Sequence, residues 1–289
     1  MIRKSMGRFT IRKALFFAAL LALATFEPGK SRAQMHRDGQ PLAADLFAAT
    51  SRNVLLRNDL SWTFGGKPQR GWYLYTPLIS SLLNTKNEVG SIGFAKALAT
   101  WQKKMGLKST GVLDDQSLYG MISIWQGARL KDREVASPDR LVIVPLSEFY
   151  DPTRAEELRQ VERASYAAYK RMVAAAVADR SLGLARGAPG ELAAGEKFLK
   201  IISAFRSREY QDKLRRESPN SGSAGLAVNS PHFTGRALDL YVGGEPVDTL
   251  DSNREVQVET RVYKWLVRNA GRFGFRPYFY EPWHWEYVK

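Results

Sequence analysis

The chain has 289 residues, of which 44% are hydrophobic and 25% charged, and it contains no cysteine. This composition excludes wholesale disorder and a disulfide framework, and the length allows two modest domains or one large one. The formal net charge of +14 favours an anionic partner.

Residues 1–33 have the pattern of an export signal. An apolar run from Ala14 to Phe26 follows five basic residues, Arg3, Lys4, Arg8, Arg12 and Lys13. The run is short for a membrane span, and Ser31 and Ala33 place small residues where a signal peptidase cuts. We therefore expect a cleaved signal, an exported protein in the periplasm or cell wall, and no stable membrane span after cleavage; an uncleaved anchor is the alternative. No Cys follows the run, which excludes a lipoprotein anchor.

Loss of residues 1–33 removes seven Lys or Arg and one acid, which leaves a net charge of +8. A moderately basic exported protein suits an anionic surface such as a bacterial envelope. Export and the absence of a basic stripe argue against nucleic acid as the partner. Residues 34–70 are predicted to be a mostly irregular lead-in with one short helix around 41–51, and His36 within it is expected to be solvated.

Residues 71–127 are predicted to be helical. Phe94, Leu98, Trp101 and Met105 recur at the spacing of one helix face, and Gly106 ends that helix. Asp114 or Asp115 can cap the next helix. Its buried face is predicted from four apolar residues, Leu118, Met121, Ile122 and Trp125.

The segment from Ala97 to Leu118 resembles the small three-helix peptidoglycan-binding domain. The shared landmarks are Trp101-Gln102, Gly106-Leu107, Thr110-Gly111, Leu113-Asp114 and Ser117-Leu118, with Ser117 where Thr is usual. The periodicity predicts only helices, and a plain helical hairpin is the alternative. Peptidoglycan as the ligand is what the resemblance implies.

Residues 128–145, dense in charge, are predicted to be a linker that leads into a second domain over residues 146–289. In that domain we expect a long helix over 153–179, a loop over 181–196 and a short apolar stretch over 198–205. A strand is expected over 237–242, with Asp239 on the face opposite Leu238 and Leu240. A helix is expected over 256–269, and the chain ends in a strand-like segment over 283–288.

Two of the three histidines of the chain lie in two short motifs, each beside a carboxylate. His232 precedes Asp239 by seven residues, and Glu281 precedes His284 by three. Two imidazoles and one carboxylate are a common ligand set for a catalytic zinc ion, which keeps a fourth position open for water. The remaining carboxylate would then be the general base. Pro282 breaks the strand pattern, and a bend there would let Glu281 and His284 converge.

These motifs are similar to those of the zinc D-alanyl-D-alanine carboxypeptidases of the vancomycin-resistance type. Further matches are Ser203-Ala-Phe-Arg206-Ser and the segment from Lys264 to Phe275, so the likeness covers roughly residues 146–289. The resemblance implies an α+β fold, in which helices pack on one side of a small antiparallel sheet and the zinc lies at its open face.

Residue by residue, the resemblance assigns one zinc ion to His232, Asp239 and His284, and the role of catalytic base to Glu281. Arg206 becomes the cation that meets charge on the substrate or oxyanion, although Arg208 could compete with it. Ser230 and Gln211 become candidate binders of a terminal carboxylate. Glu286 receives no role.

The function implied is zinc-dependent removal of the terminal D-alanine from peptidoglycan stem peptides. Two alternatives stay open: an endopeptidase of the same superfamily, which would cut elsewhere in the stem or cross-bridge, and a non-catalytic wall-binding protein. The presence of all four metal and base residues argues against the last.

Overall fold

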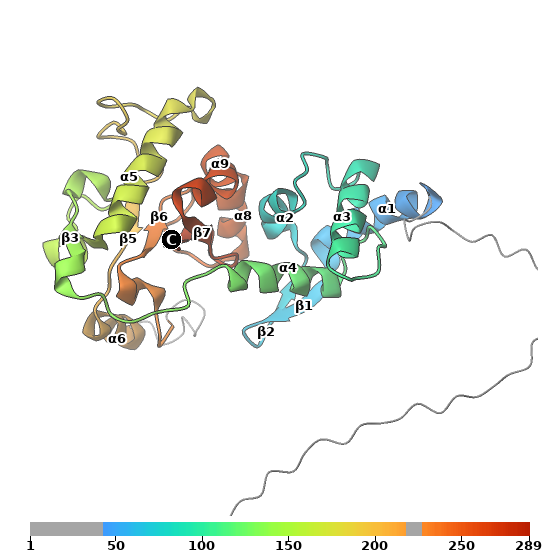
Figure 1. Cartoon of the computed structure of the whole chain (residues 1–289), viewed down its shortest axis with the longest axis horizontal. Helices are drawn as coiled ribbons and strands as arrows, with labels where there is room; N and C mark the ends of the chain where they lie inside the picture. The colour runs from blue at the N-terminus through green and yellow to red at the C-terminus, as the bar shows by residue number, and fades with distance from the viewer. Residues whose placement is uncertain (1–42, 218–226) are drawn as a thin grey trace, which may run out of the picture. The chain divides into compact units, whose positions relative to one another are not determined.

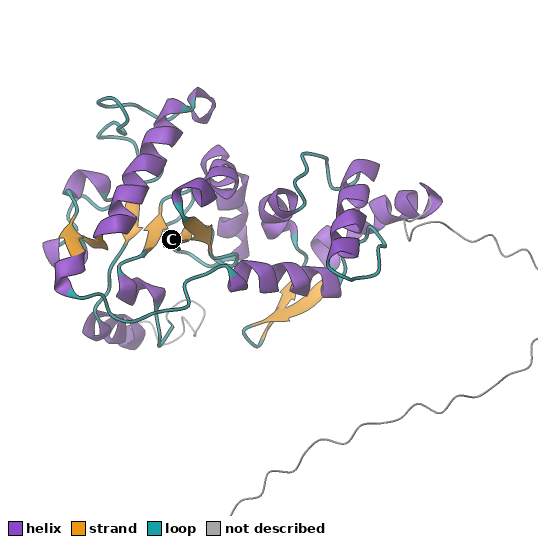
Figure 2. Cartoon of the chain, viewed as in Figure 1, coloured by secondary structure: helices purple, strands orange, loops and turns teal. Residues whose placement is uncertain are grey.

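The computed structural model describes residues 43–217 and 227–289, so the predicted signal and His36 lie outside the described residues. All the described residues belong to one compact unit. Short strands lie among more numerous helices (Figure 2). None of the helices in the described ranges has the length and apolar character that a membrane span requires.

The first part of the chain is more ordered than the sequence indicated. Helix α1 (Ala43–Asp59) is followed by an antiparallel hairpin, β1 (Ser61–Phe64) and β2 (Lys67–Arg70). Gly65 and Gly66 both have positive φ, which a two-residue hairpin turn requires. The short helix expected around 41–51 is confirmed as the first part of α1, whereas the irregular structure expected over residues 52–70 is wrong. Buried Asn53 holds α1 in place, because its side chain bonds the backbone of Gly111 and Leu113 at 2.9 and 2.8 Å.

The predicted helices of residues 71–127 are confirmed. They are α2 (Thr76–Leu82), α3 (Ile92–Lys104) and α4 (Asp115–Gly127). Asp114 caps α4 by accepting from the backbone of Ser117, and the four predicted core residues of α4 are buried. Gln102 is 1% exposed and bonds both the Gly111 amide and the Ser117 hydroxyl at 2.9 Å. It thereby fixes the turn between α3 and α4.

The second part begins with two short strands and a helix. Strand β3 (Leu141–Ile143) pairs with β4 (Gln160–Glu162), and α5 spans Arg163–Ala178. The single helix predicted over 153–179 is wrong in its first ten residues. There a 3-10 helix, Glu156–Leu158, precedes β4, which pairs with β3. The Glu162 carboxylate then caps α5 by accepting from the Ser165 amide at 2.8 Å.

The central sheet is antiparallel, with strand order β5-β6-β8-β7. Three of its strands, β5, β6 and β7, are labelled in Figure 1. Its strands are β5 (Ile201–Ser203), β6 (Ala237–Leu240), β8 (His284–Tyr287) and β7 (Phe275–Pro277). Helix α6 (Arg208–Glu217) follows β5. Leu238 and Trp285 are paired across strands and belong to the buried core, so the side chains one residue along each strand point to the opposite face.

The helix predicted over 256–269 is two helices, α8 (Asp251–Glu259) and α9 (Arg261–Asn269). Thr260 between them is extended, and its hydroxyl accepts from the Tyr263 amide at 3.1 Å. The break therefore comes from a local cap that interrupts a continuous apolar pattern. Helices mixed with small antiparallel sheets fit the predicted α+β class.

Candidate active site

One row of side chains crosses three strands of the central sheet. Ser203 of β5 is in register with Asp239 of β6, which is in turn in register with His284 of β8. Cross-strand neighbours on one face lie close enough for direct contact. Asp239 Oδ1 lies 2.9 Å from His284 Nδ1, and both side chains are buried. Strand pairing alone therefore brings together two of the three predicted metal ligands.

His232 reaches this row from a short 3-10 helix, Pro231–Thr234, immediately before β6. The Ser230 hydroxyl caps that helix by accepting from the His232 amide, and Gly235 ends it with φ +64°. A Cβ at position 235 would approach Glu162 N within 2.9 Å, so the motif requires glycine there. His232 Nε2 lies 3.3 Å from Asp239 Oδ2.

The Glu281 side chain enters the site from a turn. The Glu281 amide donates to the Tyr278 carbonyl, and the His284 amide donates to the Glu281 carbonyl. This turn places Glu281 Oε2 4.0 Å from His284 Nδ1. The expected convergence of the two side chains around Pro282 is confirmed.

The three side chains assigned to zinc satisfy the donor requirements of a metal site. One potential ligand atom from each of His232, Asp239 and His284 lies within 4.8 Å of the other two. The observed separations of 2.9 and 3.3 Å approach the roughly 3.3 Å between ligands of a tetrahedral site with bonds near 2.0 Å. Zinc therefore fits the residues present.

The outer ring nitrogens support the same conclusion. His232 Nδ1 donates to the Ala204 carbonyl at 2.7 Å, which leaves Nε2 with its lone pair toward the cluster. His284 Nε2 lies 3.2 Å from Glu286 Oε1, which leaves Nδ1 facing the cluster. Bonds of this kind, from the far nitrogen to a carbonyl or carboxylate, orient histidine ligands in metal sites.

Burial and charge shift the pKa values of the cluster in different directions. Burial lowers the pKa of His232 to about 4, with help from the Arg206 charge. Burial also disfavours a charged His284, but its hydrogen bonds to Asp239 and Glu286 outweigh that effect and raise its pKa to about 9. Burial raises the pKa of Glu281 to about 7, and the negative charge of Asp239 adds to the rise. The pKa of Asp239 lies well below its usual range, because the two histidines outweigh its burial.

Arg206 contacts the cluster of His232, Asp239 and His284. Its guanidinium donates to Asp239 Oδ2 at 2.8 Å and to the Ser203 hydroxyl at 3.0 Å, and a longer contact of 3.4 Å reaches Gln211 Oε1. Gln211 is 1% exposed and donates to the Ala227 carbonyl, so it contacts Arg206 from the protein interior. Ser230 lines the cavity in front of the cluster. Arg208 stacks over Phe233.

The sequence analysis missed two residues that hold His284. Glu286 is fully buried and lies one strand pleat beyond His284 on β8. Its carboxylate accepts from His284 Nε2, from Arg129 Nε at 3.0 Å and from the Leu130 amide at 2.8 Å. Arg129 also lies 3.8 Å over the Tyr278 ring. The period of two along β8 was a signal for Glu286, whereas nothing in the sequence indicated that Arg129 would reach it.

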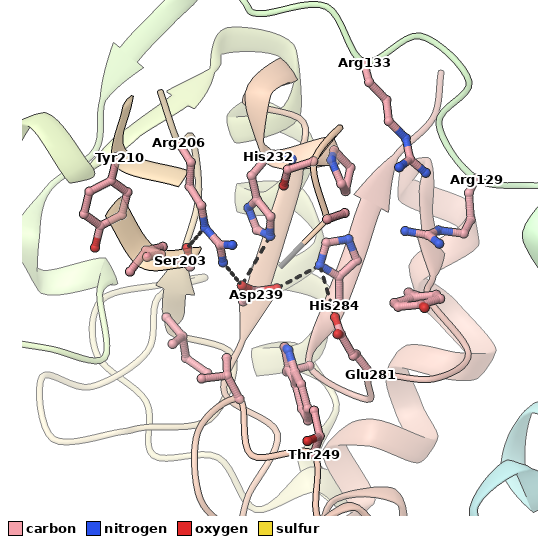
Figure 3. Close-up of a pocket in the computed structure, with 18 of the residues that line it drawn as sticks. Arg129, Arg133, Ser203, Arg206, Tyr210, His232, Asp239, Thr249, Glu281 and His284 are labelled. Atoms are coloured by element: carbon pink, nitrogen blue, oxygen red, sulfur yellow. Dashed lines mark hydrogen bonds and ion pairs between the residues drawn. The ribbon is translucent and has the colours of Figure 1, made fainter. Parts of the chain in front are cut away.

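The site is a cavity of about 520 Å³ with the cluster in its wall (Figure 3). A buried His-Asp-His cluster with the Glu281 carboxylate beside it offers the donor types of a hydrolytic metal site, and it is a candidate for one.

Residues 190–289 match the family model described as VanY, D-alanyl-D-alanine carboxypeptidase. This match confirms, for residues 190–289, the resemblance drawn from the motifs, and it supports a carboxypeptidase. The matched segment contains all four candidate metal and base residues. A solved structure described as the LdcB LD-carboxypeptidase is 24% identical over 54% of this chain and 71% of that chain, with a TM-score of 0.37. No curated protein matches the chain.

Proposed function

We propose that this protein is a zinc-dependent D-alanyl-D-alanine carboxypeptidase that removes the terminal D-alanine from peptidoglycan stem peptides. The observation that carries the proposal is the buried His232–Asp239–His284 cluster with the Glu281 carboxylate 4.0 Å from His284 Nδ1. Its place within the segment that matches the VanY model supplies the substrate class.

His232, Asp239 and His284 would hold the zinc ion. When bound, zinc supplies a Lewis acid that polarises the scissile carbonyl and lowers the pKa of water to about 7. The Glu281 carboxylate takes a proton from the attacking water and returns it to the leaving amine nitrogen. Burial raises the pKa of Glu281 in the metal-free site, which favours the return of the proton, and the positive charge of a bound zinc ion would offset part of that rise.

Arg206 supplies positive charge beside the cluster, where negative charge develops on the carbonyl oxygen or is carried by the terminal carboxylate. Gln211 and Ser203 keep its guanidinium in place. Ser230 lines the cavity and is proposed as a substrate contact; Gln211 is proposed to act through Arg206.

The test is mass spectrometry of pentapeptide stems incubated with the zinc-loaded protein. Loss of one terminal alanine to give tetrapeptides is expected, and amidation of the C-terminal carboxylate should abolish cleavage. Equal cleavage of the amidated peptide would favour the endopeptidase alternative. A zinc-loaded, folded protein that cleaves neither peptide would favour the non-catalytic alternative.

The helical segment 71–127 is proposed to bind the peptidoglycan polymer and raise the effective concentration of substrate. The segment does not stand apart: Tyr75 and Trp125 pack on Phe279, two residues before Glu281, at ring separations of 5.4 and 6.0 Å. The test therefore uses the intact Glu281→Gln protein. It should sediment with insoluble peptidoglycan even when soluble pentapeptide saturates the catalytic site, and full displacement by the peptide would contradict a second binding region.

A further inference from the structure

Four arginines line the cavity in front of the His232–Asp239–His284 cluster: Arg129, Arg133, Arg154 and Arg206. Two of them form salt bridges with buried carboxylates. Arg206 pairs with Asp239, and Arg129 pairs with Glu286. Arg129 thereby helps to hold His284, while Arg206 also faces the cavity, where it is proposed to meet charge on the substrate.

Within the described ranges 43–217 and 227–289, neither of the other two forms a salt bridge, although Glu286 acts on Arg133, and Asp151 and Asp239 act on Arg154, at longer range. Arg133 donates only to the Asn229 carbonyl, at 2.9 Å, and the Nε of Arg154 is buried without a hydrogen-bond partner. Both side chains are half-buried, and burial lowers the pKa of each. A partly desolvated cation that no carboxylate contacts directly destabilises the free protein, and an anionic ligand in contact with it would offset that cost.

The two unpaired arginines lie at different ends of the cavity. Arg133 lies near enough to Arg129, Glu286 and Tyr278 to interact with them electrostatically. Arg154 interacts instead with Arg206 and Tyr210, and with the carboxylates of Asp151 and Asp239. Figure 3 shows Arg129 and Arg133 on one side of the cluster and Arg206 and Tyr210 on the other, with His232 and His284 between them.

We propose that the cavity binds a peptide with two carboxylates, one on each side of the scissile bond. Arg154, beside Arg206, takes the C-terminal carboxylate, and Arg133 takes a side-chain carboxylate on the acyl side. The inference rests on the proposed function, and it names the substrate class more closely: stem peptides whose third residue keeps a free acidic group. Arg133 and Arg154 lie outside the segment that matches the VanY model, so this preference would come from the preceding part of the chain.

Binding tests this without turnover, in the zinc-loaded Glu281→Gln protein. Three synthetic pentapeptides serve as probes: one with both carboxylates free, one amidated at the C-terminus, and one amidated at the side chain of the third residue. Each amidation should weaken binding about tenfold to a hundredfold, because each removes a charge-assisted hydrogen bond.

In Arg133→Gln, side-chain amidation should no longer weaken binding, whereas C-terminal amidation should weaken it as before. In Arg154→Gln, C-terminal amidation should no longer weaken binding, whereas side-chain amidation should weaken it as before. This double-mutant logic isolates each pair from general loss of charge. Lys131→Gln is the matched control, since it removes an exposed positive charge two residues from Arg133 and should change neither effect. Arg133→Lys should restore part of the side-chain effect, which separates charge recognition from misfolding.

The inference is overturned if Arg133→Gln and Arg154→Gln both remove the effect of the same amidation, or if neither removes any effect. It is also overturned if each variant removes the effect assigned to the other. Cleavage by the unaltered protein separates this inference from the proposed function. If the unaltered protein cleaves stem peptides but Arg133→Gln does not change the effect of side-chain amidation on binding, only the inference is contradicted. If the peptides bind with the expected pattern but are never cleaved, only the proposed function is contradicted.

Discussion

The two histidines of the cluster are held by different parts of the protein. His232 donates to a backbone carbonyl, Ala204 O, so no side-chain substitution removes its partner. His284 depends on Glu286, and Glu286 depends on Arg129, which is 157 residues away in sequence. One candidate ligand is therefore oriented by a backbone carbonyl and the other by a chain of side chains. We expect the proposed metal site to be vulnerable to mutation mainly on the side of His284.

The largest effect is expected where a ligand is removed. His284→Ala leaves two protein ligands and should lose zinc, with activity lost along with it. Glu281→Gln should instead keep stoichiometric zinc, while turnover falls by the 10²- to 10⁴-fold typical of losing a general base. Metal analysis beside kinetics on both variants checks the assignment. Zinc loss in Glu281→Gln, or full activity in it, would require a new role for Glu281.

A smaller effect is expected for the group behind His284. Glu286→Ala removes the acceptor of His284 Nε2 and leaves Arg129 unpaired, so zinc affinity should fall about 10- to 100-fold. Arg129→Gln leaves the carboxylate in contact with His284 and should lower affinity less. Competition titration with a chelator measures both. The control is Glu259→Gln, which removes an exposed partner of Lys264 far from the chemistry; equal zinc affinity in Glu286→Ala and this control would remove the distinction between the two histidines.

The pH dependence of the metal-free protein sharpens the comparison further. The folded-state pKa of His284 is raised from 6.5 to about 9, so its contribution to stability is full below pH 6.5 and is lost as the pH rises through 9. The folded-state pKa of His232 is lowered to about 4, so its contribution is present above pH 6.5 and is lost as the pH falls toward 4. The loss on the alkaline side is roughly 3 kcal/mol for a shift of this size.

Thermal unfolding of the chelated protein between pH 4 and 9 measures this. The contribution of Glu281, whose pKa is raised to about 7, also falls as the pH rises from 4.5 through 7, so the measurement uses the Glu281→Gln protein. In that background the melting temperature should fall on both sides of the middle of the range, and adding His284→Gln should flatten only the alkaline side. Zinc-loaded protein should show the reverse alkaline trend, because metal binding displaces the His284 proton and gains affinity as the pH rises. An alkaline slope that survives in the metal-free double variant would contradict the assignment.

Much of the cluster was predictable because its motifs are short. Ser230, His232 and Gly235 lie within six residues, and their positions follow from one capped 3-10 turn and one residue with positive φ. The helix face of α4 and its Asp114 cap were equally local, since each depends on spacing within four residues. For such features the sequence by itself determined the outcome.

Only the tertiary structure decided where competing local patterns would stop. The apolar pattern over 256–269 is continuous, yet Thr260 caps a second helix, and residues before Arg163 pair as a strand although they fit a helix. The tertiary structure also decided the surroundings of four charged side chains, Glu286, Arg129, Arg133 and Arg154. An arginine on a charged linker is normally solvated, and its burial depends on which strand edge the linker crosses. Sequence spacing does not predict the contacts of these side chains, because they are made by packing between segments far apart in the chain.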